Sequence, residues 1–358
     1  MKHLGPDRIR FLVKRFGSAV KSLRASPEEI ASLPNFGKKI SSSIRKLKER
    51  DDWRQELKLI KRYGINILLY TDPLYPKNLL KIPNPPTLLY VMGKLLPEDK
   101  KSAAIVGTRQ ASIYGMEMAE KISYELAKSS YTIVSGLARG IDSMAHRGAI
   151  KGGRTIAFVG SGLANLYPSE NQKLAKNIAE SESGAIISEF PMTSPPEKYH
   201  FPLRNRLISG MSEGVLLIEA PIKSGAMITM ELAHKQKRKL FALPGRADGR
   251  SFQGNHFLIK KKMASLIESA KDIDEQLGKS FVFTNDANES ILKKQALPLT
   301  FEEEDLWKKM PSEECSIGEL VQRTKIPIME INALIINLTL KKWVKEFPGK
   351  IYKKIQRP

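Results

Sequence analysis

The sequence predicts an α/β protein with a doubly wound, mostly parallel β-sheet. Apolar runs such as AAIVG, YTIVSG, RTIAFVG, GAIISEF and GVLLIEA alternate with stretches of helical periodicity between residues 103 and 267. These runs are rich in Val, Ile and Leu and show no polar alternation, which is typical of strands buried on both faces of a parallel sheet. Their regular alternation with helices predicts the doubly wound arrangement.

Net charge narrows the class of partner. The chain of 358 residues holds 59 Lys and Arg against 38 Asp and Glu, a net charge of +21. An excess of this size favours nucleic acid or an anionic membrane surface. No apolar stretch approaches the roughly 18 residues of a membrane span, and the first residues, MKHLGPDRIRF, lack the apolar region of a signal peptide. With a single cysteine, Cys315, no disulfide framework is possible, so we expect a cytoplasmic protein that binds nucleic acid and no membrane.

The length of the chain and two changes in composition predict several domains. Pro-rich residues 81–101 mark one change, and the polar, acidic residues 284–305 mark the other. We predict the following domains: a small helical domain at residues 1–62, the α/β domain at 63–283, a linker at 284–300 and a C-terminal domain at 301–358.

The first domain is predicted to consist of short helices of the helix-hairpin-helix or SAM-like kind. LPNFGKKI, from Leu33 to Ile40, resembles a helix-hairpin-helix turn, whose glycine lets backbone N–H groups approach a DNA phosphate. Helix pairs joined by a glycine also serve as packing modules, so both roles stay open.

The last domain is predicted to hold three helices and a hairpin. FEEEDLWKKM, SIGELVQRTK and PIMEINALIINLTLKKWV have helical patterns, and VKEFPGKIYKK places Pro-Gly at a turn. This order resembles a winged helix, and a protein-interaction module is the alternative. Because the third helix has no cation before Lys341, base-specific contacts in a major groove are not expected.

The turns after the predicted strands carry the candidate site. Ligands of doubly wound sheets bind beyond the carboxyl ends of the strands, and the turns there include VGTRQ, SGLARGID, EKYHFPLRNR and EAPIKSGAMIT. Nearly every turn has a glycine and most add a cation. Ser224-Gly225 and Ser161-Gly162 are turns suited to an anion at a helix N-terminus. The convergence of these loops predicts a phosphate-binding edge.

Structural roles are the alternative for several of these side chains. Arg204 and Arg206 lie two residues apart, so on a helix they point to different sides. Whether Arg206 meets a ligand or pairs with Glu189 or Glu219 stays open at this point. Arg139 is alternatively a surface residue.

Signatures of catalysis are weak. The five histidines are scattered without metal-ligand spacing, and there is no pair of cysteines. Gly107 and Gly115 are eight residues apart, which departs from the dinucleotide-binding fingerprint. His146 is expected to be a packed histidine rather than a base. We therefore expect no catalytic residue, no metal, no cofactor and no enzymatic activity.

Seven longer motifs carry a family resemblance. AIVGTR, VSGLARGIDSMAHRGAI, GGRTIAFVGSGL, SEFP, FPLRNRLISG, EAPIKSGAMITMELA and LPG…GNHFLI resemble those of the DNA-processing protein A family, also called DprA or Smf. The resemblance runs through most of residues 60–272. It implies an extended Rossmann-like domain that binds single-stranded DNA and forms dimers. It also implies a recombination mediator that protects incoming DNA and helps load the RecA recombinase during natural transformation.

The resemblance also implies site residues. By motif, the DNA-contacting cations are Arg109, Lys198, Arg204 and Lys223, with close-approach turns at Gly107, Ser161, Gly162, Ser224 and Gly225. Arg139, Asn205 and Arg206 complete the predicted set, and the nearby rings of Tyr199 and Phe201 are candidates for stacking on bases. The segment KKKMA at residues 260–264 departs from the usual acidic-Gly-Ala ending of the family, which bears on the dimer and RecA surfaces.

Three further expectations concern association and alternative functions. A homodimer is predicted through the apolar residues near the end of the α/β domain, namely Phe257, Leu258, Met263, Leu266 and Ile267. One alternative function is a Rossmann-type enzyme acting on a nucleotide phosphate, because KSGAMITME resembles the glycine-rich loop of phosphoribohydrolases. The other is a winged-helix regulator of transcription.

Overall fold

The computed structural model describes residues 4–48, 52–180, 183–278, 298–347 and 349–355. The chain divides into two compact units, Met1–Phe281 and Val282–Pro358, and each is described by itself. The predicted linker at 284–300 lies outside the described residues, except for its last three positions.

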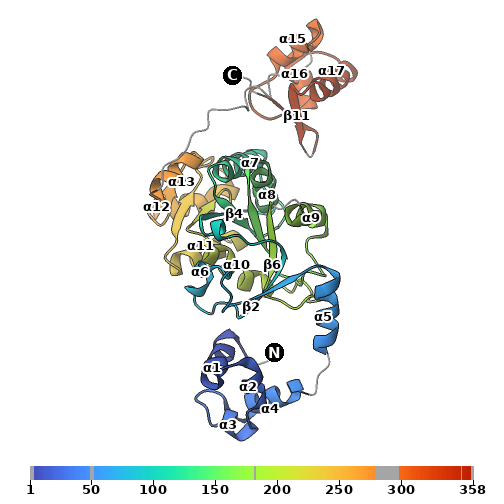
Figure 1. The fold of residues 1–358 in the computed structure, drawn as a ribbon. Coiled ribbons are helices and arrows are strands. Elements are labelled where there is room, and N and C mark those ends of the chain that lie inside the picture. Colours follow the sequence, from blue (N-terminus) through green and yellow to red (C-terminus); the bar gives the residue numbers. More distant parts are fainter. Residues whose placement is uncertain (1–3, 49–51, 181–182, 279–297, 348, 356–358) are drawn as a thin grey trace. The chain divides into compact units, whose positions relative to one another are not determined.

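A nine-stranded sheet forms the centre of the first unit (Figure 1), in the order β1-β2-β6-β5-β4-β3-β7-β8-β9. Neighbouring strands from β3 to β9 pair in parallel, whereas β1 pairs with β2, and β2 with β6, in antiparallel fashion. The predicted α/β fold with a mostly parallel sheet is therefore confirmed. The strands are Asn66–Leu69 (β1), Leu88–Gly93 (β2), Ser102–Val106 (β3), Thr132–Ser135 (β4), Thr155–Phe158 (β5), Gly184–Ser188 (β6), Gly214–Leu217 (β7), Lys239–Ala242 (β8) and Ser265–Leu266 (β9).

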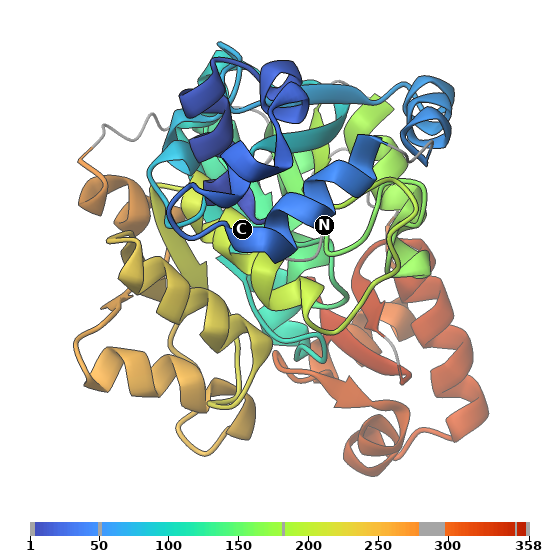
Figure 2. The same cartoon turned by 90° about the horizontal axis from the view of Figure 1, so that it is seen from below.

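The central strands are apolar throughout because both faces of the sheet are covered by helices (Figures 1 and 2). In β3, Ala104 and Val106 belong to the core on one face, and Ala103 and Ile105 to the core on the other. This alternation follows from the two-residue period of a strand. Burying each large aliphatic side chain here contributes about 1.5–3 kcal/mol.

The helices of the α/β part follow the strands as the sequence predicts. They are Lys77–Leu80 (α6), Ile113–Lys128 (α7), Ile141–Gly152 (α8), Gln172–Glu180 (α9), His200–Met211 (α10), Gly225–Lys235 (α11), Gln253–Lys260 (α12) and Ala270–Gln276 (α13). Helices α7 and α8 pack closely through glycine. A Cβ atom on Gly148 would lie 2.1 Å from the carbonyl oxygen of Glu120, so only glycine fits there.

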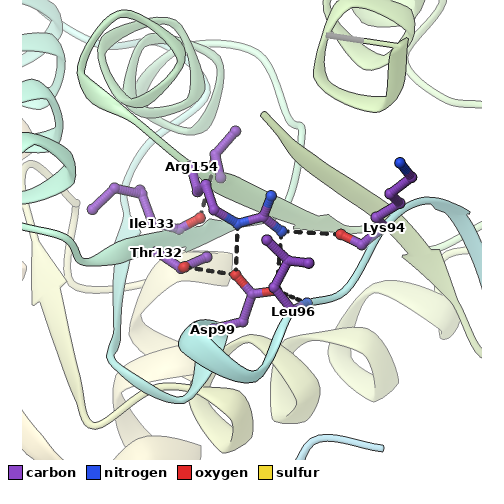
Figure 3. A network of polar contacts seen from close by, with 7 residues as sticks. Lys94, Leu96, Asp99, Thr132, Ile133 and Arg154 are labelled. Atoms are coloured by element: carbon purple, nitrogen blue, oxygen red, sulfur yellow. Dashed lines mark hydrogen bonds and ion pairs between the residues drawn. The ribbon is translucent and has the colours of Figure 1, made fainter. Parts of the chain in front are cut away.

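A buried carboxylate joins the amino ends of β4 and β5 (Figure 3). Asp99 accepts hydrogen bonds from Thr132 Oγ1 at 2.7 Å, Arg154 Nε at 3.0 Å and the Leu96 amide at 2.7 Å. Arg154 Nη2 also donates to the Lys94 carbonyl oxygen at 3.0 Å. Both carboxylate oxygens of Asp99 thus accept hydrogen bonds. The network holds β4 and β5 together at their amino ends, on the edge of the sheet opposite to the carboxyl ends of the strands.

Five helices precede the sheet: Pro6–Phe16 (α1), Ala19–Arg24 (α2), Pro27–Ala31 (α3), Gly37–Lys48 (α4) and Asp52–Arg62 (α5). Helices α1, α3 and α4 share a small core that includes Leu12, Ile30 and Ile40. Gly37 opens α4 with φ of +60°, which explains the glycine of the predicted hairpin turn. Helix α5 instead contributes Leu59 to a core beside the sheet.

In its described residues, 298–347 and 349–355, the second unit has three helices and a three-stranded antiparallel sheet in the order β10-β12-β11. Its elements are Phe301–Lys309 (α15), Cys315–Ser316 (β10), Ile317–Thr324 (α16), Ile328–Leu340 (α17), Val344–Phe347 (β11) and Ile351–Lys354 (β12). Leu306, Leu320 and Ile335 lie in its core. The three helices and the hairpin lie where the sequence predicts them. In the ranges described here, no helix is both long and apolar enough to cross a membrane.

The predicted dimer surface is wrong in two of its residues. Leu258 and Ile267 are buried in the cores on either face of the sheet, because α12 and β9 close that end of the domain. Phe257 and Leu266 are exposed. Less apolar surface is therefore available there than the sequence predicts.

Candidate nucleic-acid interface

A cleft of about 770 Å³ opens at the carboxyl ends of β3 and β7. From β3 the sheet continues through β4 and β5 in one direction, and from β7 through β8 and β9 in the other. Ligands of doubly wound sheets bind at such a reversal of strand order. Residues of four segments line the cleft: 106–110, 138–142, 198–208 and 221–229.

The loop after β3 is fixed by a buried glutamate. The Thr108 amide donates to the main-chain oxygen of Glu219 at 2.7 Å, and the Ser112 hydroxyl donates to its carboxylate at 2.7 Å. A Cβ atom on Gly107 would lie 2.5 Å from Ile141 Cγ1, so glycine is required where this loop crosses α8. The loop holds Arg109 at the cleft, with its guanidinium 5.1 Å from the centre of the Phe201 ring.

Arg204 lies beneath the cleft and is only 4% exposed. Its Nη1 donates to the carbonyl oxygens of Gly136 and Phe158, and a Cβ atom on Gly136 would lie 2.0 Å from this nitrogen. Burial lowers the pKa of Arg204 to about 10, while nearby Asp142 opposes this shift. Burial likewise raises the pKa of Asp142, and Arg204 opposes that shift.

The family resemblance groups Arg204 with the turn cations Arg109, Lys198 and Lys223, but the structure buries Arg204. Arg204 lies on the buried side of α10, so its guanidinium satisfies main-chain oxygens at the ends of β4 and β5. It has a structural role in the floor of the cleft. A direct contact of Arg204 with DNA stays a prediction.

Arg206 does not line the cleft. It forms an ion pair with Glu189, and both side chains are mostly buried. Its Nη1 also donates to the Asn84 carbonyl oxygen at 2.9 Å. Burial raises the pKa of Glu189, and the guanidinium of Arg206 opposes this rise. Of the two roles that the sequence leaves open, the structure favours the paired one.

Three exposed cations surround the cleft: Arg109, Lys198 and Lys223. None of them has an ion-pair partner among the described residues. Arg139 also lines the cleft, but its Nη1 lies 3.5 Å from Glu170 Oε1 in an exposed ion pair. Four exposed cations of the predicted turns thus line the cleft, and three of them have no ion-pair partner among the described residues.

The N-terminus of α11 opens onto the cleft. Ser224 caps this helix by accepting from the Met227 amide at 3.4 Å. Gly225 is exposed, and a Cβ atom there would have no neighbour within 4 Å. Asn205 Nδ2 donates to the Gly225 carbonyl oxygen at 3.3 Å, which joins α10 to this turn. The first turn of α11 thus presents N–H groups and a favourable dipole to an anion.

Ser161 and Gly162 lie outside the cleft lining. Ser161 is buried, and the Gly162 amide already donates to the Ser194 carbonyl oxygen at 2.9 Å. A Cβ atom on Gly162 would lie 2.1 Å from the Pro191 carbonyl oxygen. The glycine therefore serves the packing of residues 191–194, and a contact of Ser161 or Gly162 with DNA stays a prediction.

The two rings predicted to stack on bases have different positions. Phe201 lines the cleft. Tyr199 is exposed outside it and packs edge-on against His200, with ring centres 4.5 Å apart.

Comparisons with known proteins identify the family. The sequence model of the DNA recombination-mediator protein A family matches residues 66–278, more than half of the chain. The chain belongs to this family. Protein Smf of Synechocystis is 33% identical to it over 389 positions, which cover 99% of this chain and 96% of the relative. Protein Smf of Escherichia coli is 37% identical over 77% of this chain and 74% of the relative.

Two solved structures resemble this family member. The X-ray structure of DNA processing protein A from Streptococcus pneumoniae has a TM-score of 0.65 and 30% identity, covering 78% of this chain and 95% of that one. A structure of DNA processing protein A from Helicobacter pylori has a TM-score of 0.55 and 32% identity, covering 62% and 98%. That structure is described as showing a single-stranded DNA binding mode.

One buried amide behind the cleft was not predicted. Asn255 Nδ2 donates to the carbonyl oxygens of Leu217 and Leu243, and its Oδ1 accepts from the Ala220 amide at 3.0 Å. It therefore fixes the ends of β7 and β8 relative to α12. A polar residue at the start of the apolar segment GNHFLI is the signal that could have identified it.

His146 is buried and packed in the interior, as the sequence predicts. The Leu137 amide donates to His146 Nε2 at 3.3 Å, and His146 Nδ1 lies 2.7 Å from Thr155 Oγ1. Because the Thr155 hydroxyl donates to the Ile133 carbonyl oxygen, Nδ1 must carry the proton of a neutral ring. In the ranges that the structure describes, no group of three His, Cys, Asp or Glu side chains is placed to hold a metal ion.

The buried histidine predicts a pH dependence of stability. Burial lowers the pKa of His146 from 6.5 to about 3, helped by the nearby charge of Arg204. Below pH 6.5 the unfolded chain gains a proton that the folded protein does not bind. The free energy of unfolding therefore decreases as the pH is lowered from 6.5 to about 3. We expect His146 to contribute up to about 1.4 kcal/mol per pH unit to this decrease.

Urea unfolding between pH 6 and 4 measures this contribution. The free energy of unfolding of His146→Gln should depend less steeply on pH than that of the wild type, whereas that of the exposed variant His234→Gln should match the wild type. Equal slopes for all three proteins would contradict the neutral, buried histidine.

Proposed function

We propose that the protein binds single-stranded DNA through the cleft, as a non-catalytic recombination mediator. The observation that carries the proposal is the placement of Arg109, Lys198 and Lys223 around one cleft, exposed and without an ion-pair partner among the described residues. The N-terminus of α11 adds a further site for negative charge. Together these groups suit the phosphates of a nucleic-acid backbone.

A single strand fits the cleft better than a duplex. A flexible backbone can thread between loops that a rigid duplex cannot enter, and its unpaired bases can stack on apolar groups. Phe201 and Ile228 line the same cleft as the cations. Stacking of a base on an aromatic ring contributes roughly 1–3 kcal/mol and tolerates any sequence. The single-stranded DNA binding mode described for the Helicobacter pylori protein supports this proposal.

The wider role follows from family membership. We propose that the protein protects incoming single strands in the cytoplasm and helps load the RecA recombinase during natural transformation, acting as a homodimer. Relatives named DNA processing protein support a role of this kind. The order of elements in the second unit supports the proposal of a winged helix there, and α1–α4 support that of a small helical domain.

A competition experiment tests the proposed function. A labelled single strand bound to the full chain is displaced with unlabelled single strand or with a duplex of equal length, from about 50 to 200 mM salt. The single strand should compete at least tenfold better at every salt concentration, since only it can enter the cleft, and both should weaken with salt. A better competition by duplex would contradict the proposal, as would hydrolysis of a nucleoside monophosphate by the protein.

A further inference from the structure

Helix α5, labelled in Figure 1, presents apolar and basic side chains together on one side. Trp53 and Leu57 are 53% and 48% exposed, and exposed Lys61 follows at the same spacing of four residues. This spacing places the three side chains along one side of the helix. Arg54 and Lys58 follow Trp53 and Leu57 directly in the sequence and are also exposed. We call these five residues the α5 face.

The fold keeps negative charge away from the α5 face. Glu56 is the only acid in residues 53–62, and its carboxylate accepts a hydrogen bond from the Met192 amide at 2.8 Å. The exposed charged residues of this range are therefore all basic. Lys58 and Lys61 have no ion-pair partner among the described residues. The α5 face thus suits a ligand with several negative charges.

Cations lie beside aromatic rings at both ends of the helix. The guanidinium carbon of Arg54 is 5.3 Å from the centre of the Trp53 ring, and that of Arg62 is 5.9 Å from the centre of the Tyr63 ring. Both rings are exposed. An exposed ring can stack on an unpaired base, and a cation next to it can contact the neighbouring phosphate. Single-stranded nucleic acid offers both groups.

Helix α5 lies at the same edge of the sheet as the cleft. Its partner Met192 belongs to residues 189–199, which start at the carboxyl end of β6 and bring Lys198 to the cleft. Tyr199, 63% exposed outside the cleft, is the last residue of this loop. Three steps between neighbouring strands separate β3 from β6, which amounts to roughly 15 Å. A strand that leaves the cleft along this edge therefore reaches α5 after a short distance.

A membrane surface and a duplex suit the α5 face less well. A helix that binds at a membrane interface inserts a broad apolar face. Within residues 53–62, only Trp53 and Leu57 are large, apolar and exposed, while Leu59 and Ile60 pack against the core beside the sheet. A duplex keeps its bases stacked inside, so it offers no free base to the Trp53 ring.

We infer that the α5 face is a second contact site for single-stranded DNA, which binds the part of a strand that extends beyond the cleft. The inference rests on the proposed function, because the cleft holds the rest of the strand. It has a consequence for strands of different length. A strand too short to reach α5 binds through the cleft alone, whereas a longer strand also gains the contacts with the α5 face.

Affinities of the full chain for a short and a long strand test the inference. Thymidine homopolymers of about 6 and about 20 nucleotides lie near the two ends of the range of site sizes known for single-strand binding. Trp53→Ala should weaken binding of the long strand about fivefold or more, because a stacked base is lost, and should leave binding of the short strand unchanged. Trp53→Phe keeps a ring and should retain most of the affinity for the long strand. Thermal melting of each variant confirms that it is folded.

Charge reversal on the helix provides a second variant with a matched control. Lys58→Glu should weaken binding of the long strand about fivefold or more and should reduce its slope of log affinity against log salt by about 0.7. Arg246→Glu changes the net charge equally, but Arg246 is paired with Asp248 and lies outside both the cleft lining and the α5 face. It should bind both strands nearly as the wild type does.

Tryptophan fluorescence reports the contact directly. The other two tryptophans, Trp307 and Trp343, pack against each other in the second unit, with ring centres 5.3 Å apart. The long strand should therefore quench the emission of the wild type more than the short strand does. Trp53→Phe should lose this difference.

Several results would overturn the inference. Trp53→Ala could bind the long strand like the wild type, or weaken both strands equally. A duplex of about 20 base pairs could lose as much affinity as the long single strand, or phosphatidylglycerol vesicles could bind the wild type and not Trp53→Ala, which would assign the α5 face to a duplex or to a membrane. Failure of the proposed function is recognised separately. Arg109→Glu would then bind the short strand like the wild type, whereas failure at α5 alone leaves the effect of Arg109→Glu intact.

Discussion

Replacing Arg204 by methionine should lower the free energy of unfolding by about 3–5 kcal/mol, the cost of breaking a buried charge pair. The substitution removes the larger of the two positive charges, Arg204 and Arg109, that stabilise the buried carboxylate of Asp142, and it removes the donor to the Gly136 and Phe158 carbonyl oxygens. For a domain of this size, thermal melting should fall by roughly 6–20 °C.

Two further variants distinguish this effect from a general intolerance to substitution. Arg109→Met removes an exposed guanidinium at the same cleft and should change the free energy of unfolding by less than about 0.5 kcal/mol. Adding Asp142→Asn to Arg204→Met should restore part of the lost stability, because the uncompensated carboxylate is then absent. Wild-type melting of Arg204→Met would contradict the structural role assigned to this arginine.

Charge reversal of the exposed cations at the cleft should affect DNA binding strongly and folding little, in contrast to Arg204→Met. Arg109→Glu, Lys198→Glu and Lys223→Glu should each weaken single-strand binding about tenfold or more, for any base sequence, because each loses a contact with a phosphate. Their melting temperatures should stay close to that of the wild type, since exposed cations contribute little stability. Fluorescence anisotropy with strands of two unrelated sequences measures the effect.

Arg246→Glu provides the matched control for net charge. Arg246 is exposed and paired with Asp248, and it does not line the cleft, yet its reversal changes the net charge by the same amount. It should bind single strands nearly as the wild type does. An equal loss in Arg246→Glu would show that overall charge, rather than the cleft, determines affinity.

The strands and the position of the site could be predicted because both depend on local patterns. Apolar runs identify strands buried on two faces, and their order in the chain identifies the edge at which the following loops meet. Arg109 and Lys223 lie at that edge for this reason. The glycines at 107 and 225 likewise follow from the need for tight turns and open helix N-termini.

The roles of individual side chains could not be predicted where they depend on distant contacts. Arg109 and Arg204 both stand in basic turn motifs, but only the packing of α10 against the ends of β4 and β5 buries Arg204. Gly162 resembles an anion turn in sequence, yet residues 191–194 cover it. Asn255 holds oxygens of strands that are distant in the chain. Sequence spacing does not reveal such contacts.

The most direct test of the central claim is the salt dependence of single-strand affinity in the triple variant Arg109→Glu/Lys198→Glu/Lys223→Glu. Each phosphate contact on a single strand contributes about 0.7 to the slope of log affinity against log salt. If the three cations contact backbone phosphates in the cleft, the slope of the triple variant should be shallower than that of the wild type by about 2. A folded triple variant with the slope and affinity of the wild type would contradict the account and would place the DNA outside this cleft.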